Sequence, residues 1–359
     1  MNKRERLLTA IEHRVPDMVP AYAINIDDVQ PYLDRLGLSS KDELCDYLGL
    51  CQRRVWPKYT LPREPYLEAG LHEEGVIGVF GTAGGAVSYS RDSGDPRPFL
   101  NAKSVKEIED AELWPSPDWW DYSVMAKKCD DVSGRGSAVV LGCWMPVICQ
   151  VFDFFGMEEA MIRMYDTPEI IEACIKKIEE FYMEYYRRQF EATKGKADIF
   201  CMGDDFATQR GMMFSPEAWR KFLKPTYKKL FGLAKSYGLK VWLHACGQFV
   251  DVMPDLVDCG MDVWETVQCH LPGNDPEFLK REFGKDIAFY GGINTQYTLP
   301  FGTTEDVRKE VRERIKVLGK GGGYICGPDH HIKPDFPIEN TLVMFDEIAK
   351  FRGEGITLY

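Results

Sequence analysis

The sequence predicts an α/β protein, a single (β/α)8 TIM barrel with an N-terminal extension. Three observations support this prediction. The chain has 359 residues, which is enough to bury one large core. Short apolar runs with strand-like composition recur along its whole length. Each run is followed by a segment with helical periodicity, and strands that alternate with helices in this way form parallel sheets that close into barrels.

Eight apolar runs are expected to form the strands. They cover residues 18–24, 75–80, 138–142, 197–202, 239–243, 261–265, 287–291 and 323–326. Helical periodicity predicts helices over residues 168–192, 216–237, 276–283, 304–318 and 338–351. We expect residues 1–359 to form one barrel. Within it, residues 27–131 are rich in proline and weakly periodic, and they are expected to form loop-rich excursions around the barrel mouth.

The charge and the cysteines restrict the classes of partner and compartment. A net charge of −12 argues against nucleic acid and against anionic membranes, because both attract basic surfaces. No stretch is long and apolar enough to span a membrane, and the N-terminus resembles an amphipathic helix rather than a secretion signal. The 11 cysteines have no regular spacing, which is typical of free thiols in a reducing compartment. We therefore expect a cytoplasmic protein with no nucleic-acid or membrane partner.

A histidine and a cysteine lie two residues apart where one predicted strand ends. His244 and Cys246 follow the apolar run 239–243. An imidazole nitrogen and a thiolate sulfur are ligands that Zn²⁺ prefers. Cys326 ends the last predicted strand, so it can join this pair only if two distant strand ends meet in space. Such a set predicts a catalytic type of zinc site, with three protein ligands and an open position.

Carboxylates and amides follow the ends of neighbouring strands, where barrels of this type place their chemistry. Asp204 and Asp205 follow the fourth predicted strand. They either orient a substrate and donate a proton, or cap a helix and pair with Arg210; for Asp205 we favour the catalytic role. The candidates for substrate contacts at these strand ends are Asp204, Gln209, Glu265, Gln268 and Asn294.

Two further strand ends leave alternatives open. Glu265 can be a fourth zinc ligand, a partner that orients His244, or a carboxylate at the barrel rim. His330 and His331, after the last strand, can bind metal, donate a proton or pack under Tyr324.

Several motifs together resemble the uroporphyrinogen decarboxylase superfamily. They are residues 4–6 (Arg-Glu-Arg), 15–20 (Val-Pro-Asp-Met-Val-Pro), 203–209 (Gly-Asp-Asp-Phe-Ala-Thr-Gln), 215–217 (Ser-Pro-Glu), 244–247 (His-Ala-Cys-Gly), 290–296 (Tyr-Gly-Gly-Ile-Asn-Thr-Gln), 328–332 (Pro-Asp-His-His-Ile) and 337–340 (Pro-Ile-Glu-Asn). The resemblance covers nearly the whole chain and implies a (β/α)8 barrel. The superfamily contains two chemistries, so the motifs do not identify one activity.

One branch of the superfamily decarboxylates uroporphyrinogen. Its members carry an Arg-Gln-Ala-Gly-Arg segment after the first strand, which holds the carboxylates of the substrate. The matching residues here, 20–27, contain no arginine and end in Asp27. A substrate with eight carboxylates would meet an acidic side chain there. A tetrapyrrole decarboxylase, or a barrel that only binds a tetrapyrrole, is therefore the alternative and not the favoured function.

The other branch contains zinc-dependent methyltransferases that exchange methyl groups with a corrinoid protein. In that branch a His-x-Cys pair and a distant cysteine bind zinc, and His244 and Cys246 match the pair. The distant cysteine lies in a Pro-Gly-Cys-Gly-Ile pattern, where this sequence has His330 in the cysteine's place, four residues after Cys326. Either residue can complete the site. The departure also argues against a thiol substrate such as coenzyme M.

The resemblance therefore implies a zinc-dependent methyltransferase. It would move a methyl group between a small O-, N- or S-methylated substrate and cobalt in a corrinoid (cobalamin) carried by a partner protein. Asp205 or His331 would supply a proton. The corrinoid is expected on a separate protein because no segment of this chain resembles a cobalamin-binding domain.

Overall fold

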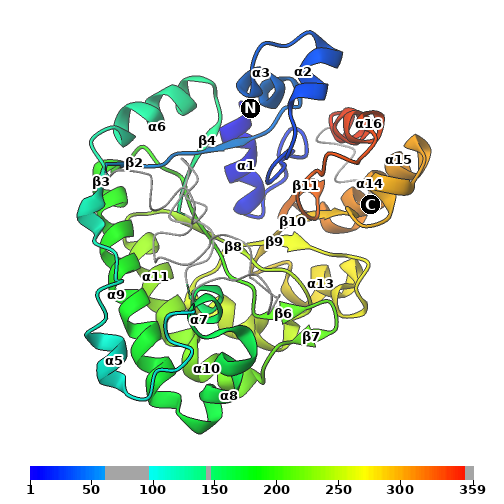
Figure 1. Ribbon diagram of the computed structural model, residues 1–359. Coiled ribbons are helices and arrows are strands. Elements are labelled where there is room, and N and C mark those ends of the chain that lie inside the picture. Colours follow the sequence, from blue (N-terminus) through cyan, green and yellow to red (C-terminus); the bar gives the residue numbers. More distant parts are fainter. Residues whose placement is uncertain (61–96, 143–146, 352–359) are drawn as a thin grey trace.

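The computed structural model describes residues 1–60, 97–142 and 147–351. Its centre is a curled, seven-stranded sheet in the order β1-β4-β5-β8-β9-β10-β11 (Figure 1). The strands are β1 (Gln52–Arg54), β4 (Ala138–Leu141), β5 (Ile199–Gly203), β8 (Lys240–His244), β9 (Val263–Val267), β10 (Ala288–Ile293) and β11 (Tyr324–Pro328). Every neighbouring pair is parallel. The predicted α/β class and parallel sheet are thus confirmed, and the spatial order follows the chain order.

The two edges of this sheet are bridged by the first predicted strand, residues 18–24. Ala21 of this segment joins the sheet through isolated parallel bridges to Leu50 and Cys326. The Tyr22 amide donates to the Cys326 carbonyl at 3.2 Å, and the Cys51 amide donates to the Ala21 carbonyl at 3.0 Å. The proline at position 20 has no N–H to donate, which shortens the ladder here. The predicted strand is therefore reduced to single bridges.

The first of the seven strands, β1, was not predicted. Its sequence is Gln-Arg-Arg, which has neither an apolar run nor an alternating pattern. The predicted strand at residues 75–80 lies outside the described residues. The remaining six predicted strands correspond to β4, β5 and β8 to β11, with shifts of at most two residues at their ends.

Three predicted helices have the observed bounds: α9 (Pro168–Ala192), α13 (Pro276–Phe283) and α15 (Thr304–Leu318). The predicted helix 216–237 is divided into α10 (Pro216–Phe222) and α11 (Lys224–Ser236). The division lies beside Pro225, which cannot donate to a carbonyl one turn earlier. The last predicted helix ends three residues early, as α16 (Ile338–Ile348).

Further helices lie around the sheet (Figure 1). They are α1 (Lys3–Ile11), α2 (Gln30–Leu36), α3 (Lys41–Tyr47), α5 (Val105–Glu109), α6 (Met125–Gly134), α7 (Ile148–Phe155), α8 (Met157–Asp166), α12 (Met253–Cys259) and α14 (Thr298–Phe301). Two small antiparallel pairs join β2 (Lys58–Tyr59) to β3 (Trp120–Asp121) and β6 (Ala207–Thr208) to β7 (Gly211–Met212). Among the described helices, none has the length and apolarity that a membrane span requires.

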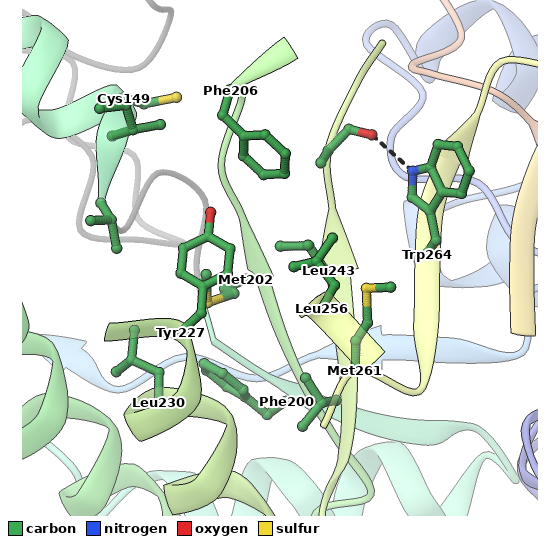
Figure 2. Packing of buried hydrophobic residues seen from close by; sticks show 14 of the residues in the cluster. Cys149, Phe200, Met202, Phe206, Tyr227, Leu230, Leu243, Leu256, Met261 and Trp264 are labelled. Carbon is green, nitrogen blue, oxygen red and sulfur yellow. Dashed lines mark hydrogen bonds between the residues drawn. The ribbon is translucent and has the colours of Figure 1, made fainter. Parts of the chain in front are cut away.

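Alternate residues of each strand enter two separate cores. Val139 and Leu141 of β4 pack in the layer between sheet and helices, whereas Ala138 and Val140 pack inside the curl of the sheet. Figure 2 shows part of the outer layer, where side chains of α11 face those of β5. Because the inner core fills the curl, the ends of the strands are where polar groups can gather.

Candidate metal centre

Three side chains converge at the carboxyl end of the sheet. His244 is the last residue of β8, Cys246 lies two residues further on, and His330 lies two residues beyond the end of β11. One donor atom from each lies within 4.8 Å of the other two. The Nε2 atom of His244 is 3.7 Å from the Cys246 sulfur. Tetrahedral zinc with ordinary bond lengths separates a nitrogen and a sulfur ligand by about 3.5 Å, so this pair is nearly in place.

The protonation state of His330 suits a metal ligand. Burial, together with the positive charges of neighbouring groups, lowers the pKa of His330 to about 3. The imidazole is thus neutral and has a nitrogen lone pair to offer. Burial raises the pKa of the Cys246 thiol well above its usual range. A divalent cation in contact with the sulfur would offset that cost and favour the thiolate. The donor set of two nitrogens and one sulfur fits Zn²⁺.

Glu265 lies behind His244 and fixes its orientation. Its Oε1 atom is 3.2 Å from Nδ1 of His244, which leaves Nε2 pointing toward Cys246. The indole of Trp242 donates to the other carboxylate oxygen. Burial alone would raise the pKa of Glu265, but the partners His244 and Arg54 outweigh it and lower the pKa. Of the three roles expected for Glu265, the geometry fits a carboxylate that orients a metal-binding histidine.

The turn between the two β8 ligands is held from the neighbouring strand. The carbonyl of Ala245 accepts a hydrogen bond from the Trp264 indole at 3.0 Å, the dashed line in Figure 2, and a second one from the Thr266 hydroxyl at 2.8 Å. Thr266 has a φ of 73°, a left-handed conformation that is rare for a β-branched residue. The strained threonine and the tryptophan together fix the peptide that connects His244 to Cys246. The sequence carries no local signal for this contact.

The two adjacent aspartates have different surroundings. Asp205 accepts a hydrogen bond from the Cys246 amide at 2.9 Å and lines the cavity described below. Asp204 is fully buried and accepts from the amides of Ile148 and Cys149, both at 3.0 Å, and from the Tyr227 hydroxyl. It therefore caps the start of α7. Burial raises the pKa of Asp204 to about 6. The predicted substrate contact of Asp204 is not supported by this position.

A cavity of about 430 Å³ opens beside the ligand cluster. The predicted site residues that line it are Asp205, Gln209, Cys246, Gln268, His330 and His331. Gln268 also accepts a hydrogen bond from the Gly247 amide at 3.0 Å. Asn294 is not part of the lining; its side-chain oxygen accepts from the amides of Gln296 and Tyr297 and holds the turn before α14.

His331 lies beside His330 but faces a carboxylate. Its Nδ1 atom is 3.0 Å from Oδ1 of Asp27, while Lys333 donates to the second oxygen of Asp27 at 2.7 Å. Burial lowers the pKa of His331, and Asp27 partly opposes this effect. His331 also lines the cavity, so it is placed to exchange a proton with a bound molecule.

Cys326 is not brought into the cluster. It is fully buried in the outer layer with the helices, whereas Ile325, its neighbour on β11, belongs to the inner core. Burial raises the pKa of the Cys326 thiol to about 12. The alternation of side chains along a strand thus directs this cysteine away from His244 and Cys246. His330 occupies the third corner of the cluster instead.

Comparisons with known proteins agree with this geometry. The family model described as "Uroporphyrinogen decarboxylase (URO-D)" matches residues 150–351. The methylcobamide:CoM methyltransferase MtaA of Methanosarcina barkeri is 27% identical over 351 residues, which covers 95% of this chain and 96% of the relative. The uroporphyrinogen decarboxylase of Pseudoalteromonas translucida is 21% identical over 375 residues, covering 98% of each chain. A solved methyltransferase structure from Methanosarcina mazei has the same fold, with a TM-score of 0.63, 19% identity and coverage of 98% of this chain and 99% of that chain.

Proposed function

The chain belongs to the uroporphyrinogen decarboxylase family, and within it we propose that the protein is a zinc-dependent methyltransferase. It exchanges a methyl group between a small O-, N- or S-methylated substrate and a corrinoid protein. The observation that carries this proposal is the cluster of His244, Cys246 and His330 beside a cavity of about 430 Å³. A catalytic zinc site needs three protein ligands and one open position facing a cavity.

The residues of the cluster and those around it have different roles in the reaction. His244, Cys246 and His330 would hold Zn²⁺, and Glu265 keeps the Nε2 atom of His244 directed at it. When bound, the metal supplies a Lewis acid that lowers the pKa of a coordinated thiol or hydroxyl. Asp205 fixes the Cys246 backbone through its amide.

Residues of the cavity lining would transfer the proton and contact the substrate. Either Asp205 or His331 exchanges the proton that accompanies methyl transfer, since both line the cavity. Gln209 and Gln268 offer amide groups to a substrate there. The names of the relatives mention coenzyme M, but the third ligand here is a histidine, so the thiol of coenzyme M is one candidate substrate among several.

The corrinoid is proposed to arrive on a separate protein. The ligands lie at the carboxyl end of the sheet, so cobalt must approach from that end. Residues 27–131 are proposed to form excursions around this mouth, and residues 1–359 a single complete eight-stranded barrel. A docked partner would orient the methyl group and cobalt at about 3–3.5 Å, which a freely diffusing cobalamin does less well. We propose the cytoplasm as the compartment.

The test follows the cobalt spectrum. Zinc-loaded enzyme is mixed with a reduced corrinoid protein and with methoxylated aromatics, methylamines or methylthiols; in the reverse direction, a methylated corrinoid protein is mixed with thiols that include coenzyme M. We expect one donor or acceptor class to change the cobalt absorbance at enzyme-like rates, above roughly 1 s⁻¹. His244→Ala should abolish this activity, whereas His270→Ala, a histidine outside the cavity lining, should retain it.

Two results would contradict the proposal. One is the absence of methyl transfer with every substrate of the panel while the wild-type protein holds stoichiometric zinc. The other is rapid conversion of uroporphyrinogen to coproporphyrinogen under anaerobic conditions, which would support the decarboxylase alternative.

A further inference from the structure

A second cavity, of about 960 Å³, opens beside the bridged first segment and β1. Residues of α3 and α6 complete its walls, and it shares no described lining residue with the metal cavity. The lining includes Tyr22, Gln52 and Arg54, which belong to the sheet and its closing segment. The proposed methyl transfer at zinc assigns no role to this space.

The charged guanidinium of Arg54 lines this cavity and has no close carboxylate partner among the described residues. One Nη atom donates to the Cys201 sulfur at 3.2 Å, and the Glu265 carboxylate lies at the limit of an ion pair, 4.0 Å away. Glu265 already accepts from His244 and Trp242. A guanidinium has five N–H donors in a planar fork, and the side chain is 23% exposed. The Tyr22 hydroxyl also lies within hydrogen-bond reach of the guanidinium. With five donors, the fork still has N–H groups left for a bound molecule.

Gln52 provides a second, independent observation. It lies two residues before Arg54 on β1, so both side chains project to the same face of the strand. The side chain is only 2% exposed, and neither atom of its amide makes a well-formed hydrogen bond to a residue that the structure describes, although the Tyr22 hydroxyl lies close to it. A buried amide without such a bond is rare in native proteins. Because Gln52 lines the cavity, a bound molecule can supply the missing bond.

The charge of the cavity lining is opposite to that of the whole chain. The chain has a net charge of −12, yet among the described lining residues five are basic and only two are acidic. The basic residues are Lys41, Arg53, Arg54, Lys128 and Arg135. Of these, Arg53 and Arg135 pair with carboxylates of α3. Lys41 and Lys128 donate to uncharged oxygens, those of the Asn25 side chain and the Trp56 backbone. The cavity therefore has an excess of positive charge.

We propose that this second cavity binds the oxyanionic end, a carboxylate or a sulfonate, of a small organic molecule. The Arg54 fork receives two oxygens of the anion, as guanidinium groups do with planar or tetrahedral oxyanions. The Gln52 amide donates a further hydrogen bond from the same side. Lys41 and Lys128 attract the anion at longer range. The site does not require zinc, so it can be tested independently of methyl transfer.

Calorimetric titration of the purified full-length protein tests this site. The probes are benzoate, benzenesulfonate and the uncharged match benzamide. We expect at least one of the two anions to bind once per chain, and benzamide to bind at least about tenfold more weakly. The affinity should be the same in a His244→Ala variant that has lost its metal. Loss of anion binding in that variant would instead place the anion on zinc and would overturn the proposal.

Variants of β1 separate a ligand site from a structural role. Gln52→Met should weaken the anion about fivefold or more without lowering the unfolding temperature, because the wild-type amide has no well-formed hydrogen bond to lose. Arg54→Lys should weaken it about tenfold or more, since lysine lacks the fork. Arg187→Lys on α9 is the matched control, because Arg187 lies outside the cavity lining, and it should bind as wild type does.

If Arg54→Lys does not fold, Gln52→Met decides the question alone. Unchanged anion affinity in Gln52→Met would overturn the proposal, as would equal affinity for benzoate and benzamide.

Discussion

The two ends of the central sheet differ in whether their polar groups are available to a ligand. At the carboxyl end, the ligand atoms of His244, Cys246 and His330 converge beside a cavity. At the amino end, α1 closes the sheet, with Leu7 and Ile11 packed into the inner core. The first end thus offers groups to a ligand, whereas the second satisfies its groups within the protein.

The amino end is held by contacts in which hydrogen-bond donors and acceptors of the protein pair with each other. Arg4 binds the carboxylate of Asp198 through two nitrogens, with distances of 2.6 to 2.9 Å, and the same carboxylate accepts from the Val139 amide. The Gly323 amide, at the start of β11, donates to the Ala10 carbonyl of α1. Substitutions at this end should change stability, and substitutions at the other end should change ligand binding. The predictions below test that separation.

The largest effect is expected for Cys246→Ser at the carboxyl end. Apparent binding free energies of structural zinc are about 10–16 kcal/mol over four ligands, so loss of one sulfur ligand should lower zinc affinity by roughly two to three orders of magnitude. Competition with a chromogenic chelator measures this change. Cys326→Ser is the matched control and should stay within about threefold of wild type, because that thiol faces the helices. Equal losses in both variants would make Cys326 a ligand after all.

At the amino end, Leu7→Ala should cost about 3 kcal/mol of unfolding free energy, since the side chain is fully buried in the inner core. Chemical denaturation of the metal-free protein measures the loss. Leu8→Ala makes the same chemical change at a half-buried neighbour and should cost less. Zinc affinity should be unchanged in both. A large loss of zinc affinity in Leu7→Ala would show that the two ends are coupled.

Glu265→Gln changes the carboxylate behind the metal-binding histidine. We expect a 10- to 100-fold loss of zinc affinity, which is about the effect of removing such a partner elsewhere. Asp329→Asn is the control, because Asp329 also faces a histidine, His270, at 3.7 Å but outside the cluster. Chelator competition should separate the two variants. If the Glu265→Gln variant held zinc as tightly as wild type, the orienting role of this carboxylate would be wrong.

The sequence predicted those parts of the site that depend on local spacing. His244 and Cys246 stand at the end of an apolar strand, two residues apart, and this is enough to predict that they converge. Whether Cys326 or His330 completes the metal site depends on the face of β11 to which the Cys326 side chain points. That face follows from the register of β11 against β10, in which Cys326 lies opposite Gly291, and no local pattern reveals it.

Elements with little apolar content were not predicted from the sequence. The strand β1 consists of three polar residues, and it is held in the sheet by pairing with β4. Its side chains Gln52 and Arg54 were therefore not recognised as site candidates, although they line the larger cavity. The strained Thr266 was missed for a similar reason, since its role depends on a contact with the neighbouring turn at Ala245. Contacts between strands, rather than composition, define these positions.

The smallest effect is a pH dependence at the amino end. Lys280 of α13 donates to the Gly322 carbonyl at 2.6 Å, just before β11. Burial lowers the pKa of this amine from 10.5 to about 8. Between about pH 8 and 10.5, the folded state thus binds fewer protons here than the unfolded state, so stability from this group rises with pH. Below pH 8 the buried charge destabilises the fold.

Lys280→Met removes both the buried charge and its hydrogen bond to Gly322, which oppose each other. We expect a net gain of about 1 kcal/mol at pH 7 and a loss of the rise in stability above pH 8. His13 lies beside Lys280, and burial lowers its pKa from 6.5, so it titrates below this window. Denaturation from pH 7 to 10.5 measures the slope, with the exposed Lys285→Met as control. An unchanged slope in Lys280→Met would mean that the amine is not desolvated, and that the amino end is less tightly closed than the packing of α1 implies.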